Sequence, residues 1–546
     1  MSDATDLHRV DVDRLLPAGL AAIAALALYL PALSGGFLSD DYSLLHAFYG
    51  ASTRDVAARV MKMFVSGVGP PSNQYRPLTM ASFAVNAMIS GANPVGWRLV
   101  NVLLHAANAA LVTLLAFQLA AGAARQVRWA ALAAGITFAW FPTNVEAVAW
   151  IASRFDAMAL LWMLIAACAF LQSRIWYDRW GVASLAATML AFMSKESAGM
   201  GPLMIVALAW AKKGEGRGFV RDGARALVVA APWMAIVVVY AAFRLWLFGD
   251  ALRFFPGSSP GHTLVTGEWL RALLDIGDWW ALAIPDTGPR RMFGAAGFAL
   301  TLGAIAASVG NRALAHIVVA IAAIVLASFA LMLSSHSAVW PSRGEGGRLL
   351  YPIAAVAALA IAAPLGAPAR RLRIVAWIVT LMLLSSELVL ARAAVERRAR
   401  AGADMLALVA AIGRVSDSAP SGSFSFVVVP DHLGSIIFAR NAQGGLMIPP
   451  VQSRSLASQL IVQTTWDLPR WPELLERDVV GSLKRGTPAD ISADPLTAPA
   501  YARPDRYFCW SLRTRSLIAL DEDFGADLRS WNATWNKALD GNGCRD

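Results

Sequence analysis

Long apolar runs recur along the chain from residue 15 to residue 391, and they constrain the fold more than any other feature. A bilayer core of about 30 Å requires roughly 20 apolar residues for each helical span. The composition agrees, because hydrophobic residues make up 57% of the chain and charged residues only 15%, whereas soluble domains are about a quarter charged. The sequence therefore predicts an all-α polytopic membrane protein over this region.

The apolar runs predict eleven transmembrane helices, and they stop before the last part of the chain. The spans are expected at 15–33, 97–121, 127–142, 155–173, 180–194, 198–211, 226–248, 293–309, 313–333, 349–366 and 374–391. The runs 180–194 and 198–211 are short, and one kinked helix is the alternative for that pair. Residues 1–392 are predicted to form the transmembrane domain and residues 393–546 a separate soluble domain.

The tail 393–546 reads as a small α+β domain. It begins with a charged helical pattern, AAVERRARAGADMLALVAAIGRV, and strand-like runs follow at SFSFVVVP, SIIF and YFCWSLRTRSLIAL. Cys509 and Cys544 both lie in this tail, where they can form a disulfide in an oxidising compartment or remain as two thiols. Cys168 lies within an apolar run and is expected to be a packing residue.

Basic residues collect in short connections between alternate apolar runs, which sets the expected orientation. They are Arg125, Arg128, Arg174, Arg179, the basic residues of 212–225, Arg312, and Arg370 to Arg373. Short cytoplasmic loops are enriched in lysine and arginine, so this side is expected to be cytoplasmic. The N-terminus is then cytoplasmic and the tail extracytoplasmic, in the inner (plasma) membrane. Because the net charge of +10 is dispersed in this way, we expect no nucleic-acid partner and expect membrane lipids as neighbours.

The long loops fall on the opposite side, and two of them contain amphipathic segments. In STRDVAARVMKMFV, residues Val56, Val60, Met63 and Phe64 share one helical face, which predicts a helix lying in the membrane interface. Loop 249–292 contains a tryptophan pair suited to the headgroup level.

Adjacent carboxylates follow the first span, in GGFLSDDYSLL. Asp40 and Asp41 would lie at the membrane surface, and like charges this close raise the pKa of one of them. A carboxylate tuned in this way suits a general base that takes a proton from an acceptor hydroxyl. The alternative is a solvated loop cap without chemistry.

Three further stretches place charges at the same outer ends of the spans, where ionisable groups indicate function. They are FPTNVEAVAWIASRFDAM with Glu146, Arg154 and Asp156, FMSKESAGMGP with Lys195 and Glu196, and WPSRGEGGRLLYP with Arg343, Glu345, Arg348 and Tyr351. Glu146 and Arg154 are eight residues apart, near one face of a helix, so a structural ion pair is the alternative there. Lysine and arginine suit phosphate binding, but a lysine at this level can also extend to the interface.

Smaller signals complete the set of candidate residues. Tyr75 and Arg76 lie in YRPL, and His105 lies in the second span, where a role in helix packing is expected. The sequence has no metal-ligand spacing, no phosphate-binding glycine loop and no nucleophile elbow.

The order of these motifs resembles the GT-C superfamily of polyprenyl-phosphate-sugar-dependent glycosyltransferases. Within it, the chain is most similar to the membrane domain of the transmembrane and tetratricopeptide-repeat O-mannosyltransferases and their bacterial relatives. The similar stretches are FLSDDYSLL, YRPLTMASFAVN, WRLVNVLLHAANAALV, FPTNVEAVAWIASRFDAMALL, SKESAGMGPL and GRLLYP, between residues 37 and 352. No tetratricopeptide repeat follows them, and Phe141-Pro142-Thr143-Asn144 replaces a histidine-bearing motif common in those enzymes.

The resemblance implies an inverting transfer of a sugar from a polyprenyl-phosphate donor to a hydroxyl of a protein, lipid or polysaccharide. Asp40 matches the first acidic position, which implies the general base, and Asp41 the second, which implies its orienter. The implied phosphate-binding residues are Lys195 and Arg348, then Arg154 and Arg76, supported by Glu146, Asp156, Glu196, Tyr75, Glu345 and Tyr351. The resemblance implies no particular cofactor, and the need for a divalent metal stays open.

Two other functional classes remain open from the sequence. A lipid or sugar transporter would also bury charges among apolar helices, although many transporters contain inverted repeats with broken helices at the midplane. A non-catalytic membrane protein of envelope assembly is the other alternative. The collection of charges at one face favours chemistry at the membrane surface.

Overall fold

The computed structural model describes residues 2–67, 73–120, 124–213, 219–249, 346–366, 369–465, 468, 505–521 and 531–544. The chain forms two compact units. The helical unit comprises Met1–Pro31, Thr53–Ala84 and Arg98–Val395, and the C-terminal unit comprises Ala32–Ser52, Val85–Trp97 and Glu396–Asp546. Two short segments from the first hundred residues thus belong to the same unit as the tail.

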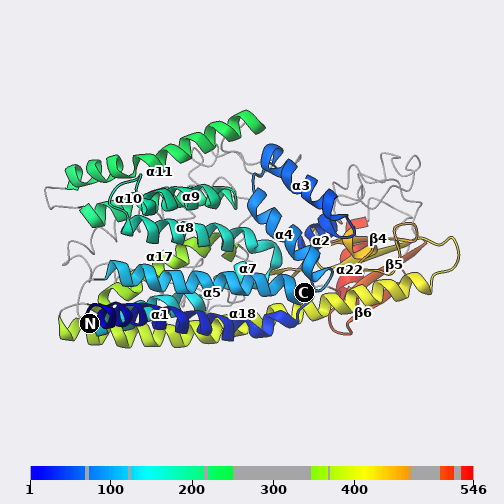
Figure 1. Ribbon diagram of the computed structural model, residues 1–546. Coiled ribbons are helices and arrows are strands. Elements are labelled where there is room, and N and C mark those ends of the chain that lie inside the picture. Colours follow the sequence, from blue (N-terminus) through cyan, green and yellow to red (C-terminus); the bar gives the residue numbers. More distant parts are fainter. Residues whose placement is uncertain are drawn as a thin grey trace. The chain divides into compact units, whose positions relative to one another are not determined.

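The helical unit consists mainly of helices, several of which, such as α5, α8 and α9, run side by side (Figure 1). They are α1 (Ser2–Tyr29), α3 (Thr53–Ser66), α4 (Pro77–Ser90), α5 (Pro94–Leu119), α6 (Ala124–Trp140), α7 (Asn144–Ala149), α8 (Arg154–Gln172), α9 (Arg179–Phe192), α10 (Met200–Lys213), α11 (Phe219–Phe248), α17 (Tyr351–Ala362) and α18 (Arg370–Asp417). Short 3-10 turns join them as η1 (Leu30–Ser34), η2 (Ile151–Ser153), η3 (Glu196–Gly199), η6 (Gly347–Leu350) and η7 (Ala363–Gly366). The ends of α4 and α5 and the second half of α18 lie in the C-terminal unit.

Local sequence explains where several helices begin and how closely they approach. Pro77 and Pro94 are first residues of helices, a position where the missing proline N–H costs nothing. The Asp178 carboxylate caps α9 by accepting hydrogen bonds from two backbone N–H groups of its first turn. Gly135 lets α6 approach α1, because a Cβ there would lie 2.7 Å from the Ala21 Cβ.

The polytopic all-α architecture predicted from the apolar runs is confirmed. Nine of the predicted spans overlap described helices. The spans 293–309 and 313–333 lie outside the described residues, as do residues 250–292 of the tryptophan-bearing loop. Within the described part of the chain, six helices are long and apolar enough to cross a membrane. Helices α6, α9 and α10 are shorter, at 17, 14 and 14 residues. The number of eleven spans therefore stays a prediction.

Residues 180–194 and 198–211 form two separate helices, α9 and α10, and not one kinked helix. Lys195, after α9, bonds Asp156 in the first turn of α8. Lys212, at the end of α10, donates hydrogen bonds to the Phe170, Leu171 and Ser173 carbonyls at the far end of α8. The chain therefore turns back between α9 and α10 at the end of the unit where α8 begins.

The amphipathic helix predicted near residues 52–65 is present as α3. Val56 is buried, and Val60, Met63 and Phe64 are partly buried, whereas the charged residues of the helix are exposed. Helix α4 follows it and was not predicted, because its apolar run is only 14 residues long and lies inside what the sequence presents as a loop.

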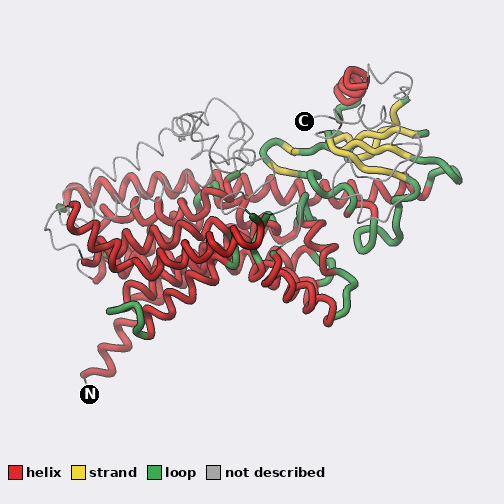
Figure 2. The backbone as a smooth tube through the Cα atoms, turned by 90° about the horizontal axis from the view of Figure 1, so that it is seen from above, coloured by secondary structure: helices red, strands yellow, loops and turns green. Residues whose placement is uncertain are grey.

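The C-terminal unit contains a four-stranded sheet with strand order β4-β1-β5-β6, drawn in yellow in Figure 2. Strand β1 (Ser425–Val429) is parallel to β4 (Leu460–Thr464) and β5 (Arg506–Ser511), and β5 is antiparallel to β6 (Ser516–Leu520). A small hairpin is formed by β2 (His432–Leu433) and β3 (Ile436–Ile437), and the unit also contains α2 (Asp41–Phe48), η8 (Gly445–Met447) and α22 (Trp531–Gly541). The predicted α+β class is confirmed, although β4 was not predicted.

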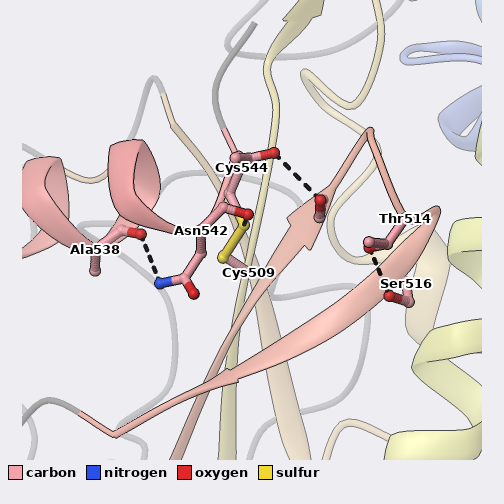
Figure 3. The surroundings of a disulfide bond; sticks show 8 residues. Cys509, Thr514, Ser516, Ala538, Asn542 and Cys544 are labelled. Carbon is pink, nitrogen blue, oxygen red and sulfur yellow. Dashed lines mark hydrogen bonds between the residues drawn. A yellow bond between two sulfur atoms is a disulfide. The ribbon is translucent and has the colours of Figure 1, made fainter.

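Cys509 on β5 and Cys544 after α22 form a disulfide in the core of this unit (Figure 3). Both cysteines are buried together with Phe426 and Trp535, whose rings are 5.7 Å apart. Of the two alternatives left open by the sequence, the structure contains the disulfide. Cys168 is buried in α8 as a free thiol, as predicted.

Replacement of both bridged cysteines by serine is expected to lower the free energy of unfolding of the C-terminal unit by about 2–4 kcal/mol. The bridge joins residues 35 apart in sequence and so restricts the unfolded chain. Urea unfolding of the full chain, followed by tryptophan fluorescence with and without reductant, measures the effect. Cys168→Ala is the control that leaves the bridge intact, and equal unfolding midpoints for the double variant and the unmodified chain would contradict the prediction.

Candidate functional site

The adjacent carboxylates Asp40 and Asp41 stand at the start of α2 and have different surroundings. Asp41 is 1% exposed, and its Oδ2 accepts a hydrogen bond of 3.0 Å from the Leu38 backbone nitrogen. Asp40 is partly exposed, and its Oδ1 accepts a hydrogen bond of 2.7 Å from the Asn441 amide. The buried carboxylate thus holds the turn into α2, whereas the other is partly exposed.

Arg76 and Glu196 form a buried ion pair in the helical unit. The Arg76 Nε donates to a Glu196 carboxylate oxygen at 2.9 Å, and an Arg76 Nη donates to the other oxygen. Burial alone would raise the pKa of Glu196, but Arg76 and then Lys195 lower it to about 2. Burial by itself would lower the pKa of Arg76, but the attraction of Glu196 outweighs burial. The pKa of Arg76 is therefore raised overall. Both groups are therefore charged at neutral pH.

Lys195 and Asp156 form a second buried pair beside the first. The Lys195 Nζ lies 2.5 Å from Asp156 Oδ1, and the two side chains are 8% and 2% exposed. Burial lowers the pKa of Lys195, and the attraction of Asp156 opposes this shift. Arg76 also interacts electrostatically with Asp156 and Lys195, so the two pairs form one cluster.

Glu146 and Arg348 form a third pair, between α7 and η6. An Arg348 Nη donates to Glu146 Oε1, and the Arg348 guanidinium lies 4.8 Å from the centre of the Trp150 ring. Gly346 and Gly347 permit this approach, because Gly346 has a φ of 91° and a Cβ at Gly347 would lie 2.6 Å from the Thr143 carbonyl oxygen.

The prediction that Glu146 and Arg154 share a helix face is wrong. Trp150 has an extended backbone (ψ 119°), so α7 ends at Ala149 and α8 begins at Arg154. Arg154 is fully buried, and its Nε donates to the Asn101 Oδ1 at 2.8 Å. Its guanidinium also lies 4.3 Å from the centre of the Phe83 ring. The two residues therefore belong to different contacts.

Aromatic rings connect these contacts into one continuous region of the helical unit. The Phe83 ring lies 5.4 Å from the Phe155 ring, and the Arg76 guanidinium lies 4.8 Å from the Phe155 ring centre. Asn101 also donates to the Trp150 carbonyl at 3.0 Å. The region contains four cationic side chains (Arg76, Arg154, Lys195 and Arg348) and three carboxylates (Glu146, Asp156 and Glu196), which leaves one positive charge in excess. We call it the charged cluster.

Tyr351 and Tyr75 have local structural contacts. The Tyr351 hydroxyl lies 2.7 Å from His105 Nδ1 and accepts a hydrogen bond of 3.2 Å from the Asn108 amide. The other ring nitrogen of His105 lies 3.1 Å from the Ala139 carbonyl oxygen, so His105 serves in helix packing, as expected. Tyr75 donates to the Phe64 carbonyl at 3.0 Å.

The charged cluster contains seven of the predicted charged residues, and Asp40 and Asp41 lie in the C-terminal unit. Glu345 and Arg343 lie outside the described residues. Sequence reasoning missed Asn101 and Asn108, although the spacing of Asn101, His105 and Asn108 along an apolar helix puts three polar side chains on one face. In the described ranges, no group of three or more metal-binding side chains is arranged to hold an ion.

Comparison with known proteins confirms the resemblance predicted from the motifs. Protein O-mannosyl-transferase Tmtc1 of Drosophila melanogaster is 32% identical over 189 residues, which is 33% of this chain and 21% of that protein. Tmtc2 of Drosophila melanogaster is 34% identical over 159 residues (28% and 16%), and human TMTC1 is 32% identical over 163 residues (28% and 18%). The chain thus spans about a fifth of the length of these relatives. No family model matches the chain.

Among solved structures, the chain is similar to the crystal structure of ArnT from Cupriavidus metallidurans bound to undecaprenyl phosphate. The TM-score is 0.39 at 14% sequence identity, over 77% of this chain and 83% of that chain. The apo form of the same protein gives a TM-score of 0.36.

Proposed function

We propose that this multi-pass membrane protein is an inverting glycosyltransferase. It transfers a sugar from a polyprenyl-phosphate donor to an acceptor hydroxyl at the extracytoplasmic face of the membrane. The proposal is carried by the different surroundings of the two adjacent carboxylates. Asp41 is buried in a turn, and Asp40 is partly exposed. The partial similarity of the chain to protein O-mannosyl-transferases also supports the proposal.

Asp40 acts as the general base in this proposal. Its carboxylate takes the proton of the acceptor hydroxyl while the acceptor oxygen attacks the anomeric carbon of the sugar. The bond from that carbon to the phosphate oxygen breaks, and the polyprenyl phosphate leaves with an additional negative charge. Asp41 holds the turn that presents Asp40.

Within the helical unit, the charged cluster holds cations that suit the phosphate group of the donor. Lys195 and Arg348 are the principal candidates, followed by Arg154 and Arg76. Each of the first two forms an ion pair with a carboxylate. A lysine carries three donors and an arginine five, so an ion pair does not exhaust their capacity. Preorganised cations of this kind stabilise charge that develops in the transition state.

Product formation distinguishes this function from transport. Purified full-length protein in liposomes, supplied with polyprenyl-phosphate mannose and candidate protein, lipid and polysaccharide acceptors, is expected to produce a glycosylated acceptor detectable by mass spectrometry. Movement of the donor lipid between leaflets without any glycosylated product would support the transporter and overturn the proposal.

The orientation of the chain is part of the proposal, because the acceptor must meet the outer face. Arg174, Arg179 and Lys212 are exposed at the end of the helical unit where α8 ends, whereas the charged cluster lies where α8 begins. The basic end is expected to face the cytoplasm.

Cysteine labelling tests this orientation. In a Cys168→Ala background, a membrane-impermeant maleimide added outside intact cells is expected to label Ser421→Cys, in the tail, and not Gly216→Cys, in the basic 211–225 connection. Gly216→Cys becomes labelled only after the membrane is permeabilised. Labelling of both positions from the same side would contradict both the orientation and the odd number of spans.

A further inference from the structure

A loop of the tail, residues 438–445, contacts the segment that contains the two adjacent carboxylates, and both belong to the C-terminal unit. The Ser39 backbone nitrogen donates to the Phe438 carbonyl at 2.9 Å, and the Ser39 hydroxyl donates to the Arg440 carbonyl at 2.5 Å. Further along the same segment, His46 Nε2 lies 3.1 Å from the Gly445 carbonyl oxygen. Residues separated by about four hundred positions are thus joined over the whole length of the motif.

The position of this loop is fixed from its other side by a buried ion pair. Arg440 Nη2 donates to Asp431 Oδ2 at 2.6 Å, and Arg440 Nε donates to Asp431 Oδ1 at 3.1 Å. Asp431 is 4% exposed, and His432 Nδ1 lies 2.5 Å from its Oδ2. Bidentate arginine–carboxylate pairs fix geometry as well as adding free energy, so the backbone next to Arg440 is held in place.

Asn441 is the residue that reaches the carboxylate. It has a φ of 60°, in the left-handed region that asparagine tolerates better than most residues. Asn441 directly follows the fixed Arg440. In this backbone conformation the Asn441 side-chain amide donates a hydrogen bond to Asp40 Oδ1 at 2.7 Å. Gly445 is required for the same close approach, because a Cβ there would lie 2.8 Å from the Tyr42 Cβ and 2.9 Å from His46 Nε2.

We propose that Asn441 is a positioning residue for the Asp40 carboxylate, with both residues in the C-terminal unit. This inference rests on the proposed function, in which Asp40 is the base. A hydrogen bond to one carboxylate oxygen fixes the direction of the other, and it favours the ionised form that accepts a proton. The charged and titratable groups near Asp40 on these segments include Asp41, Tyr42, His46 and Arg440.

The test uses two substitutions of Asn441 in the full chain. Asn441→Gly removes the amide and tolerates the positive φ, and we expect kcat to fall about 10–100-fold with KM for the donor unchanged. Asn441→Asp keeps the size of the side chain but places a second negative charge against Asp40. We expect the acid limb of its pH–rate profile to move to higher pH by about one unit.

Ser43→Ala is the matched control, because the Ser43 hydroxyl bonds the backbone carbonyl of Asn441 at 3.4 Å and not the carboxylate. Its pH–rate profile is expected to match that of the unmodified chain. If Asn441→Asp and Asn441→Gly also keep the unmodified kcat and profile while the unmodified chain transfers sugar, the positioning role is wrong and the proposed function stands. An unmodified chain that forms no product with any donor overturns both.

Discussion

Asp40→Asn is expected to lower the rate of sugar transfer by about 10²–10⁴-fold, the usual contribution of a positioned general base. An acceptor hydroxyl is a poor nucleophile until its proton is removed, and an amide cannot accept that proton. The substitution keeps the size of the side chain at a partly exposed position, so the protein is expected to remain folded. Turnover with purified protein and a polyprenyl-phosphate sugar, with thermal unfolding measured in parallel, checks both statements.

Two matched substitutions control for the loss of a carboxylate. Asp41→Asn retains an oxygen that can accept the Leu38 N–H bond and is expected to reduce transfer less than Asp40→Asn, or at most equally. Asp55→Asn, on the exposed face of α3, is expected to leave transfer unchanged. Full turnover by both Asp40→Asn and Asp41→Asn would exclude a base in this motif and turn attention to Glu146 or Asp156.

Lys195→Met is expected to lower the free energy of unfolding by about 3–5 kcal/mol, which is the typical cost of breaking a buried ion pair. The substitution removes the ammonium group that lies 2.5 Å from the Asp156 carboxylate, a side chain only 2% exposed. Replacing both partners, Lys195→Met with Asp156→Leu, removes the uncompensated charge and is expected to restore most of the stability. Thermal unfolding of each variant in detergent measures these differences.

The double variant also separates stability from donor binding. If Lys195 neutralises the donor phosphate, KM for the polyprenyl-phosphate sugar is expected to rise about tenfold or more in both variants, as for the loss of a hydrogen bond to a charged group. Lys62→Met, at an exposed lysine of α3, is the control with no expected effect on either property. Recovery of normal donor use in the double variant would show that the pair serves only structure.

The sequence alone determined the membrane helices and much of the C-terminal domain. Apolar runs long enough to span a bilayer predict helices wherever they occur, because backbone hydrogen bonds must be satisfied within the segment. Helical periodicity predicted which face of α3 is apolar and which is charged. A short run of β-branched residues predicted β1. Helix α4 and strand β4 were missed because each is a short apolar segment, which by itself fits more than one structure.

The candidate residues were also found from sequence, but their partners were not. Lys195 pairs with a residue 39 positions away, Arg76 with one 120 positions away, and Asp40 with one 401 positions away. The sequence suggested instead that Glu146 and Arg154 belong to one helix face, which the extended backbone at Trp150 prevents.

Only the tertiary structure shows which charged residues form pairs. It also shows that the segment with Asp40 and Asp41 belongs to the same unit as the tail. Helical periodicity fixes the face on which a side chain lies, but it does not fix which other helix covers that face. The Asp40–Asn441 contact depends on a loop fixed by Arg440 and Asp431 and on two residues, Ser39 and Asn441, with positive φ. Such contacts arise from packing between segments distant in the chain, and local propensity carries no information about them.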